Sequence, residues 1–537
     1  MPQYFGKLPT TNQPWQKVGR VESVNQKEHI INLISGNSCL SISILAANLV
    51  RVHFTPTGEF LPCRPWAVTM DDEEWEQIPF EVKETETTLE ITTAKIRLCI
   101  QKQNCHLTCF DLENRPFAQD ADIGIGWRLG AVAGWKKIAA DEHFFGFGER
   151  TGFLDKLSQV KTNWTTDALD YDALTDEMYQ AIPFFMALRP NVGYGIFFNT
   201  TFWSQFDIGA AQPGVWKMET RGGELDYYII YGPEPAEILR TYTQLTGRMS
   251  LPPKWALGYH QCRWSYDSEN VVRELAQEFR QRRIPCDVIH LDIDYMRGYR
   301  VFTWSPTRFS NPAQLIGDLA IDGFKTVTII DPGVKYEPEA DYHVFDQGLA
   351  HDYFVRKVDG TLFHGYVWPE KAVFPDFMRA DVRHWWGNLH KSLTDIGVAG
   401  IWNDMNEPAI DSRPFGDGGE KIWFPLDAPQ GGEGENTNHT EVHNLYGLMM
   451  AKACFEGLQQ HRQQERSFVL TRSGYAGVQR WSAVWMGDNH SLWEHLEMSL
   501  PMLCSMGRCG WWGLVGLAIL ADLQETQRRK CLPVGCR

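Results

Sequence analysis

The sequence predicts an α/β protein in which an N-terminal antiparallel β-sandwich precedes a (β/α)8 barrel of the TIM type that is incomplete at its C-terminal end. Three observations lead to this fold class. Short stretches of alternating polarity fill the first part of the chain. Apolar strands then alternate with helical segments, as in α/β folds. The last residues follow neither pattern. With 537 residues, the chain is long enough for two or more domains.

The predicted sandwich domain covers residues 1–245. Apolar and polar side chains alternate in its short strands, which places the apolar side chains on one face of each strand. Turns separate these strands, as is typical of an antiparallel sandwich. Gly193–Phe198 has the composition of a later strand of the same domain. The alternating strands are Leu40–Ile44, Val50–Phe54 and Ile96–Ile100.

The predicted barrel domain covers residues 246–507, and Pro252-Pro253 marks its beginning. Ser268 is a candidate N-cap for a helix whose apolar positions Val271/Val272, Leu275 and Phe279 recur every three to four residues. Six apolar runs read as parallel strands, and most of them end in a polar residue or a carboxylate. The runs are Trp255–Gln261, Cys286–Asp294, Lys325–Gly333, Val398–Pro408, Ser467–Ser473 and Ser482–Asn489.

Two segments of the barrel domain are too long and irregular to be simple strand-to-helix loops. They cover residues 335–390 and 410–440 and are rich in Gly, Pro and acidic residues. Long loops in a compact domain are commonly functional. We therefore expect both segments to be insertions that cover the active site.

Carboxylates gather at the ends of the predicted strands. The carboxyl ends of the strands in a parallel barrel meet at the rim that holds the active site. Like charges at one rim lower stability, so they indicate a functional site more than a set of helix caps. Two carboxyl groups about 5–5.5 Å apart carry out glycoside hydrolysis with retention. The candidates by position are Asp292, Asp294, Asp331, Asp404, Glu407 and Asp488.

Two motifs resemble the catalytic segments of glycoside hydrolase family 31, a family of retaining α-glycosidases. GIWNDMNEPA at Gly400–Ala409 is similar to its nucleophile signature. The resemblance implies that Asp404 is the nucleophile and that Glu407 is a structural carboxylate beside it. VWMGDN, which begins at Val484, is similar to the acid/base motif and implies that Asp488 is the proton donor. The family more often has Thr where this chain has Met486.

The resemblance extends to the sugar site and spans roughly residues 140–505. HLDIDYM implies that Asp292 binds the hydroxyls of the non-reducing glucose, and RSGYAGVQRW implies that Arg472 contacts both sugar and catalytic carboxylates. TNWTTDALDY resembles a loop of the N-terminal domain whose Asp, here Asp167, contacts the sugar. The resemblance further implies that Trp402 and Trp485 wall the pocket. Three other tryptophans, Trp255, Trp264 and Trp304, are expected in the core.

The function implied is that of an exo-acting α-glucosidase. It would release terminal α-linked glucose from maltose-like oligosaccharides with retention, and it would need no cofactor and no metal. The same catalytic pair serves α-xylosidases and transglucosylases, which stay open as alternatives. The alternative that is not an enzyme is an inactive truncated product. A metal-dependent hydrolase is disfavoured because no His/carboxylate ligand spacing recurs at the strand ends.

Net charge and hydropathy limit the classes of binding partner that we expect. The net charge of −16 argues against nucleic acid and against an anionic membrane surface, and it is compatible with a neutral oligosaccharide. No run of eighteen apolar residues is present, and the first residues lack the pattern of a signal peptide. The expected location is therefore the cytoplasm. The sequence leaves the oligomeric state open.

The final segment, residues 508–537, departs from the family pattern, which continues with a strand ending in a DIGGF-like motif. Leu517–Arg537 can be encoded by a DNA sequence that has a second meaning in another reading frame. When its first two bases are dropped, this DNA translates as GDIGGFAGNATAEMFARWMQ. This reading restores the motif. We therefore expect a frameshift near residues 505–516, which would leave the barrel without its last two strands.

Overall fold

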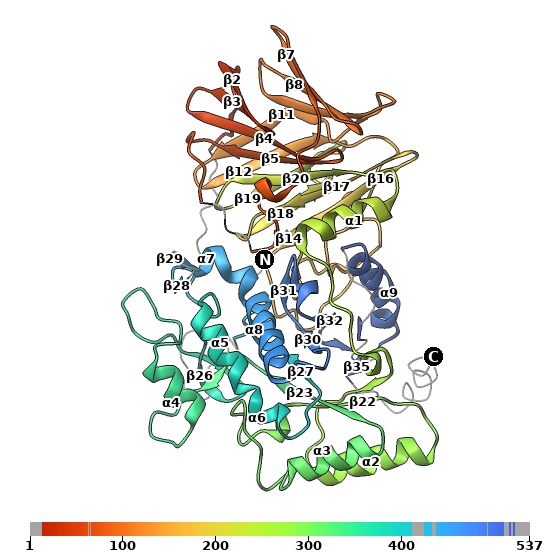
Figure 1. The fold of residues 1–537 in the computed structure, drawn as a ribbon, viewed down its shortest axis with the longest axis vertical. Coiled ribbons are helices and arrows are strands. Elements are labelled where there is room, and N and C mark those ends of the chain that lie inside the picture. The colour runs from red at the N-terminus through yellow and green to blue at the C-terminus, as the bar shows by residue number, and fades with distance from the viewer. Residues whose placement is uncertain are drawn as a thin grey trace. The chain divides into compact units, whose positions relative to one another are not determined.

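The computed structural model describes residues 13–509 except for 63, 65, 411–423, 432–435 and 491, and it also describes the backbone of 515–516 and 519–520. Its chain divides into two compact units (Figure 1). The sandwich unit comprises Met1–Trp164, Ala181–Arg248 and Pro501–Trp511. The barrel unit comprises Thr165–Gln180, Met249–Leu500 and Trp512–Arg537. The segment that begins at Thr165 therefore packs with the barrel, although it lies within the predicted sandwich range.

Three antiparallel sheets build the sandwich unit. Their strand orders are β13-β16-β17-β20-β5-β4-β3-β2, β1-β11-β12-β19-β18-β14 and β10-β9-β8-β7-β6. Helix α1 (Pro235–Thr246) follows the last of these strands. The strands are β1 (Gln16–Lys17), β2 (Ser23–Lys27), β3 (Ile30–Ser35), β4 (Ser38–Ala46), β5 (Leu49–Thr55), β6 (Glu81–Glu84), β7 (Thr88–Thr92), β8 (Ile96–Gln101), β9 (His106–Asp111), β10 (Pro116–Phe117), β11 (Asp120–Arg128), β12 (Ala131–Lys137), β13 (His143–Gly146), β14 (Val160–Asn163), β16 (Phe184–Arg189), β17 (Val192–Phe198), β18 (Ser204–Ile208), β19 (Val215–Thr220) and β20 (Leu225–Tyr231).

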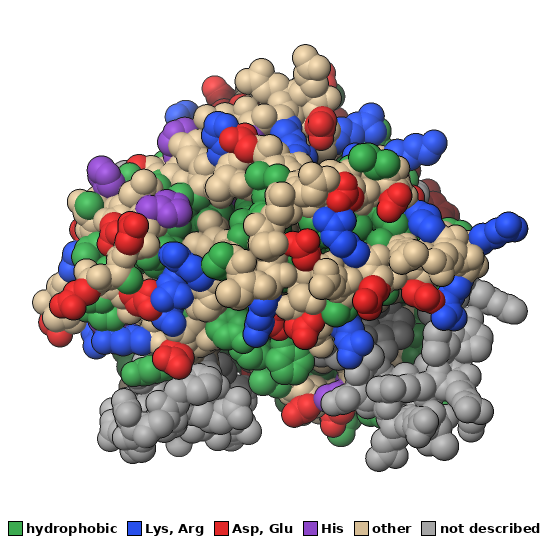
Figure 2. Space-filling model, turned by 90° about the horizontal axis from the view of Figure 1, so that it is seen from below, with side chains coloured by type: hydrophobic (Ala, Val, Ile, Leu, Met, Phe, Trp, Pro, Cys, Tyr) green, Lys and Arg blue, Asp and Glu red, His purple; other side chains and the backbone are tan. Residues whose placement is uncertain are grey.

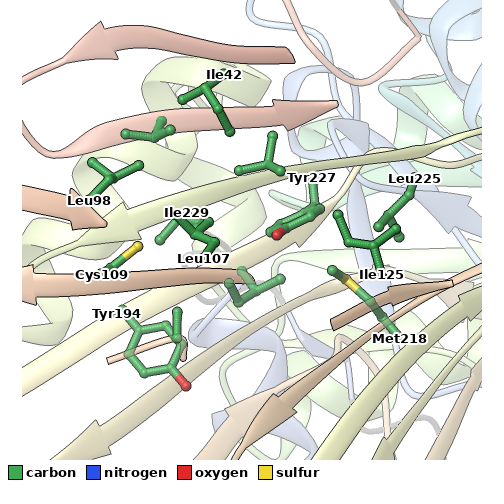
Figure 3. Packing of buried hydrophobic residues seen from close by; sticks show 14 of the residues in the cluster. Ile42, Leu98, Leu107, Cys109, Ile125, Tyr194, Met218, Leu225, Tyr227 and Ile229 are labelled. Atoms are coloured by element: carbon green, nitrogen blue, oxygen red, sulfur yellow. The ribbon is translucent and has the colours of Figure 1, made fainter. Parts of the chain in front are cut away.

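The core of the sandwich unit follows from the alternation in the sequence. Ile96, Leu98 and Ile100 of β8 are completely buried while their neighbours are partly exposed. Strand β4 is buried on both faces, which its alternating sequence does not predict. Figure 3 shows Ile42 and Leu98 in one cluster of buried side chains. Each fully buried aliphatic side chain contributes about 1.5–3 kcal/mol to stability.

A seven-stranded parallel sheet forms the centre of the barrel unit, in the order β21-β22-β23-β27-β30-β32-β34. All six predicted runs contribute to it. The run Trp255–Gln261 is wrong in extent, because Lys254–Leu257 is a 3-10 helix and only its last two residues form a strand. Strand β34 is an addition from beyond residue 507. The strands are β21 (His260–Gln261), β22 (Val288–Leu291), β23 (Lys325–Ile330), β27 (Gly400–Asn403), β30 (Val469–Thr471), β32 (Ala483–Trp485) and β34 (Val515–Gly516).

Helices separate most of these strands, as in a β/α barrel. Helix α2 begins directly after Ser268, as predicted, but the Ser268 side chain makes no capping hydrogen bond. Its buried positions are Val272 and Ala276, whereas Val271 is exposed. The helices are α2 (Glu269–Gln281), α3 (Pro312–Ile321), α4 (His343–Ala350), α5 (Ala380–Leu389), α6 (Lys391–Thr394), α7 (His439–Val442), α8 (Tyr446–His461) and α9 (Trp493–Gly507).

The two predicted insertions differ in how much of them is described. Residues 335–390 hold helices α4 and α5 and most of a small antiparallel sheet in the order β24-β26-β25. Strands β28 and β29 pair within 410–440, of which 411–423 and 432–435 lie outside the described residues. The remaining short strands are β15 (Gln180–Ala181), β24 (Val334–Lys335), β25 (Gly365–Val367), β26 (Glu370–Val373), β28 (Pro429–Gly431), β29 (Asn436–Asn438), β31 (Gly474–Tyr475), β33 (Asn489–His490) and β35 (Ile519–Leu520).

The surface carries mixed charge. Figure 2 shows acidic and basic side chains interspersed on one face, without a large patch of either sign. In the described part of the chain, no helix has the length and apolar character needed to cross a bilayer. Most of the predicted frameshifted segment, including residues 521–537, lies outside the described residues.

Candidate active site

Five strands of the parallel sheet deliver a charged side chain to the same edge. Parallel strands end at one edge of their sheet, so residues that directly follow them lie close together. Four of these side chains come in the first position after their strand, and the fifth comes three residues after its strand. They are Asp292 after β22, Asp331 after β23, Asp404 after β27, Arg472 after β30 and Asp488 after β32.

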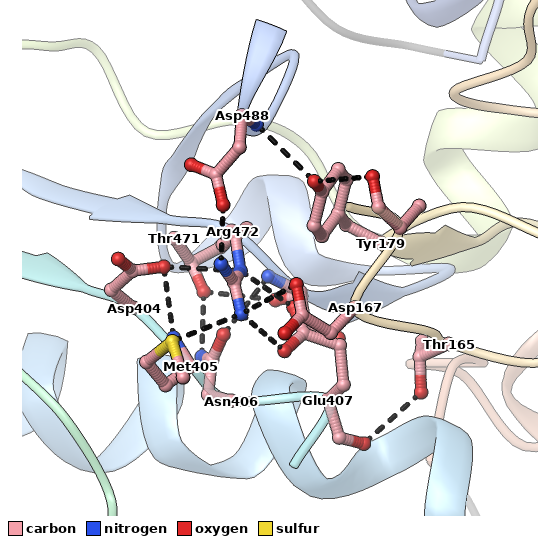
Figure 4. Close-up of polar contacts among 12 residues, drawn as sticks. Thr165, Asp167, Tyr179, Asp404, Met405, Asn406, Glu407, Thr471, Arg472 and Asp488 are labelled. Atoms are coloured by element: carbon pink, nitrogen blue, oxygen red, sulfur yellow. Dashed lines mark hydrogen bonds and ion pairs between the residues drawn. The ribbon is translucent and has the colours of Figure 1, made fainter. Parts of the chain in front are cut away.

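Arg472 lies among the side chains of Asp167, Asp404, Glu407 and Asp488 (Figure 4). Its Nε is 3.0 Å from Asp404 Oδ1, and its Nη1 is 3.0 Å from Asp488 Oδ2. Glu407 accepts two hydrogen bonds from the guanidinium, at 3.0 and 2.8 Å. Nη2 is also 3.4 Å from Asp167 Oδ1. We call these five residues the Arg472 cluster. One buried cation therefore holds four carboxylates from three segments of the chain.

The four carboxylates differ in exposure. The side chain of Asp488 is 29% exposed and that of Asp404 is 12% exposed. The Glu407 side chain is only 2% exposed, and both of its oxygens bind the guanidinium. A carboxylate that reacts with a ligand needs an accessible oxygen. Asp404 and Asp488 meet this requirement and Glu407 does not.

The backbone after Asp404 makes a sharp turn. Met405 has a φ of 56°, in the left-handed region that costs a non-glycine residue roughly 1 kcal/mol. In this conformation the Met405 N–H donates to Asp404 Oδ1 at 2.8 Å. Asn406 then donates to Thr471 at 2.9 Å and accepts from the Ser473 N–H at 2.9 Å. The turn is thereby tied to the strand end that carries Arg472.

The segment from Thr165 to Gln180 also positions the cluster. Tyr179 accepts from the Asp488 N–H at 3.2 Å and donates to the Ala168 carbonyl at 3.0 Å. The Thr165 hydroxyl donates to the Glu407 carbonyl at 3.1 Å. These contacts are visible in Figure 4. They place Asp167 beside Arg472 from a segment that sequence reasoning assigned to the other domain.

Burial is the largest influence on the carboxyl groups of the site. It raises the pKa of Asp404 well above its ordinary value, and the neighbouring carboxylates raise it further. The Arg472 guanidinium opposes this and lowers it. Burial also raises the pKa of Asp292 to about 7 and that of Asp331 to about 7. Asp292 is in addition held by the Ile293 N–H, which donates to it at 2.7 Å.

Asp294 is the one strand-end candidate that faces elsewhere among the described residues. Its carboxylate forms an ion pair with Arg308 at 2.6 Å, and its side chain is 18% exposed. Among the residues that the structure describes, no group of three or more His, Cys, Asp or Glu side chains is arranged to hold a metal ion. The cation that the carboxylates share is the Arg472 guanidinium.

Tryptophans accompany the cluster. Trp402 and Trp485 are buried and meet edge to face, with ring centroids 5.5 Å apart. The expectation that Trp264 lies in the core is wrong, because it is 58% exposed. Its ring lies 5.8 Å from that of Trp368, which is itself exposed. Trp264 comes three residues after β21, so its place at a strand end was the signal for its exposure.

Replacement of Asp331 by Asn is expected to stabilise the protein at alkaline pH. Asp331 is buried, and its Oδ1 has no hydrogen-bond partner in the described part of the chain. Its folded pKa of about 7 exceeds the unfolded value of about 3.9, so the carboxyl group lowers the free energy of unfolding as pH rises from about 4 to about 7. Asn does not titrate. Thermal unfolding at about pH 8 should show a gain on the order of 1 kcal/mol.

At pH 4.5 the same variant should gain much less, because the wild-type group is then protonated. Asp395→Asn is the matched control, since Asp395 is exposed and pairs with Lys391. It should give the same small change at both pH values. An equal effect of Asp331→Asn at both pH values would contradict the prediction.

Two family models match the chain. The model described as "Glycosyl hydrolases family 31 TIM-barrel domain" matches residues 249–515. The model described as "Glycosyl hydrolase 31 N-terminal galactose mutarotase-like domain" matches residues 39–207. Their order along the chain agrees with the fold class that the sequence predicts.

Curated relatives agree with the family models. The chain is 41% identical over 495 residues to alpha-glucosidase 2 of Bacillus thermoamyloliquefaciens, a match that covers 92% of the chain and 61% of the relative. It is 34% identical over 388 residues to an alpha-glucosidase of Saccharolobus solfataricus, covering 70% of the chain and 55% of the relative. The chain therefore spans about three-fifths of the length of these relatives.

Solved structures that align with the chain agree with the two family models. A dextranase of Flavobacterium johnsoniae, complexed with isomaltotriose, aligns with a TM-score of 0.84 at 30% identity, over 92% of the chain and 60% of the neighbour. The glucosidase II alpha subunit aligns with a TM-score of 0.82 at 25% identity, over 94% of the chain and 63% of the neighbour.

Proposed function

Since the chain belongs to glycoside hydrolase family 31, we propose that it is a retaining exo-α-glucosidase that hydrolyses terminal non-reducing α-linked glucose from maltose-like oligosaccharides. The observation that carries the proposal is that Asp404 and Asp488 bind the same Arg472 guanidinium, each at 3.0 Å. Two accessible carboxylates held this close together suit retaining hydrolysis. The curated relatives at 41% and 34% identity are both named alpha-glucosidases.

In the proposed mechanism Asp404 attacks the anomeric carbon of the glucose. The bond from that carbon to the leaving oxygen breaks, and Asp488 gives the leaving oxygen its proton. A covalent glucosyl ester on Asp404 results. Asp488, now ionised, takes a proton from a water molecule, which attacks the same carbon and releases Asp404. Two inversions give net retention, and both carboxyl groups return to their starting protonation states.

Arg472 is proposed to keep the nucleophile ionised. Burial alone would hold a proton on Asp404, and the guanidinium at 3.0 Å favours the carboxylate. Glu407 fixes the guanidinium through its two hydrogen bonds and is proposed to act only by positioning it. A bidentate carboxylate restrains both the place and the plane of an arginine.

Sugar recognition is proposed to use the remaining polar and aromatic groups. Asp292 and Asp167 would accept hydrogen bonds from glucose hydroxyls, because both carry carboxylates beside the catalytic pair. Trp402 and Trp485 would wall the pocket through the apolar faces of their rings. The mixed surface charge in Figure 2 suits a neutral oligosaccharide partner.

The domain boundaries are proposed at 1–245 and 246–507, with 508–537 as a frameshifted segment. A cytoplasmic location is a prediction from the sequence alone. An α-xylosidase or transglucosylase would use the same pair of carboxylates, and a dextranase is among the similar structures.

Proton NMR of maltose hydrolysis tests the proposed function. α-Glucose should appear first and then mutarotate to the β-anomer, because retention preserves the α configuration. Nitrophenol should be released faster from p-nitrophenyl α-glucoside than from p-nitrophenyl α-xyloside. Initial formation of β-glucose would contradict retention, and faster xyloside cleavage would favour the xylosidase alternative. A thermal transition shifted by maltose would separate a folded enzyme from an inactive truncated product.

A further inference from the structure

Two histidines lie in a continuous line of contacts between Thr165 and Asp376. The Thr165 carbonyl is 2.8 Å from His443 Nε2, and His443 Nδ1 is 2.9 Å from His439 Nε2. His439 Nδ1 is 2.7 Å from the side-chain amide of Gln430, whose other end is 3.4 Å from Asp376 Oδ1. All five residues are buried. We call them the histidine chain.

The four contacts of the histidine chain need four hydrogens. The Thr165 carbonyl only accepts, a neutral imidazole carries one ring hydrogen, and an ionised Asp376 carries none. The Gln430 amide donates toward one of its two neighbours and accepts from the other. Two neutral histidines and the amide thus supply three hydrogens. The Gln430 nitrogen donates to Asp376, so its oxygen faces His439 and only accepts. The three ring contacts at 2.7–2.9 Å then need three hydrogens from two neutral rings, so one is missing.

We propose that the histidine chain holds one additional proton and that this proton fixes the position of Thr165, and with it Asp167, beside Arg472. His443, His439 and Asp376 are then positioning residues. The consequence for catalysis rests on the proposed function, whereas the proton itself does not.

The proton has two places that complete the chain. It can make one histidine an imidazolium, with Asp376 ionised. It can instead protonate Asp376, with both histidines neutral and the Gln430 amide turned so that its nitrogen faces His439. Burial favours the second arrangement, because it contains no charge. Burial lowers the pKa of His439 well below its usual range and that of His443 to about 4, and it raises the pKa of Asp376 to about 6.

Other groups around the chain have defined partners. Asp376 accepts from the Gly431 N–H at 2.7 Å and from the Met378 N–H at 3.2 Å. Arg379 lies near enough to lower the pKa of Asp376, but less than burial raises it. Three further described neighbours have partners of their own: Phe424 stacks on His439, Glu441 accepts from Thr437, and Tyr446 donates to the Pro375 carbonyl.

Thr165 connects the histidine chain to the Arg472 cluster. The Thr165 N–H donates to Asn444 at 2.9 Å, and its hydroxyl donates to the Glu407 carbonyl at 3.1 Å. Asp167 follows two residues later and faces Arg472 at 3.4 Å. A Thr165 carbonyl that loses its partner is free to shift, and Asp167 moves with it.

The direction of the pH effect follows from Asp376. Its folded pKa of about 6 exceeds the unfolded value of about 3.9, so the folded protein keeps the proton below about pH 6 and loses it above. The histidine chain is therefore complete at about pH 5. At about pH 7.5 the ionised Asp376 accepts from the Gln430 nitrogen, both rings change tautomer, and His443 Nε2 faces the Thr165 carbonyl without a hydrogen. Its contribution to the free energy of unfolding falls as pH rises between about 4 and about 6.

Asp376→Asn tests the proposal, because an amide supplies the hydrogen at every pH. Deuterium exchange of the peptide 165–171, corrected for intrinsic rates, should show wild-type protection about fivefold lower at pH 7.5 than at pH 5, the effect of one lost hydrogen bond. Asp376→Asn should show equal protection at both pH values. Equal wild-type protection at both pH values would overturn the proposal, as would a pH-dependent loss retained in the variant.

His461→Gln is the matched control, since His461 lies on α8, is not part of the histidine chain, and contacts the Gly387 carbonyl. It should keep the wild-type pH dependence of protection. If Asp376→Asn does not fold, the wild-type comparison at the two pH values decides alone. Failure of the proposed function is separable: no hydrolysis of α-glucosides with pH-dependent protection intact refutes the glucosidase assignment and supports the histidine chain. For an active enzyme, KM should rise with pH in the wild type but not in Asp376→Asn, with kcat changed less.

Discussion

Replacing Asp404 with Asn is expected to lower kcat for p-nitrophenyl α-glucoside on the order of 10⁴-fold, because a neutral amide cannot form the glucosyl ester. The shape of the side chain is kept, and the Met405 N–H retains an acceptor. The thermal midpoint should therefore stay near that of the wild type. Initial rates of nitrophenol release, measured beside a melting curve, check both parts of this expectation.

Asp294→Asn is the matched control for this experiment. Asp294 also follows a barrel strand, but its partner is Arg308 and it stands outside the Arg472 cluster. Its replacement should leave kcat within about threefold of wild type, the range expected for a site away from the chemistry. Normal turnover by Asp404→Asn would refute its assignment as nucleophile.

Azide makes the test sharper with Asp404→Ala. The smaller side chain leaves room for azide to attack in place of the missing carboxylate, in a single displacement. The product should then be β-glucosyl azide, with inverted configuration. α-Glucosyl azide from this variant would contradict the role of Asp404, because retention requires an intermediate on the enzyme.

Asp488→Asn is expected to reduce kcat/KM for maltose about 10³-fold, because the leaving glucose then departs without a proton. α-Glucosyl fluoride should suffer far less in the first step, since fluoride leaves without protonation. The ratio of the two losses is the quantity to measure. A loss of equal size on both substrates would contradict the assignment of Asp488 as the acid.

Asp488→Ala with azide gives the complementary product. Here the ester on Asp404 still forms, and azide attacks it without help from a general base. Two inversions then yield α-glucosyl azide. Opposite configurations from the Asp404 and Asp488 variants would identify the two roles within one assay, independently of rate.

The sequence predicted the strand-end residues well for a physical reason. Parallel strands bring their carboxyl ends together, so Asp404 and Asp488 were expected to be neighbours before any distance was known. The apolar alternation of β8 likewise predicted its buried face, because a strand has a period of two. These are local patterns whose geometry is set by the backbone itself.

Features that depend on distant packing were predicted poorly. Trp264 was expected in the core because large aromatics are usually buried, yet composition does not tell which tryptophan stands at a strand end. The segment around Asp167 packs with the barrel, although it lies between strands of the sandwich. The four-carboxylate arrangement around Arg472 likewise joins segments hundreds of residues apart, and no local periodicity encodes it.

The shared cation also constrains how this protein can evolve. A single substitution of Arg472 would leave four carboxylates near one another without their shared cation, so each one-step path through that position is strongly unfavourable. Lysine would not reproduce the fork that binds Glu407.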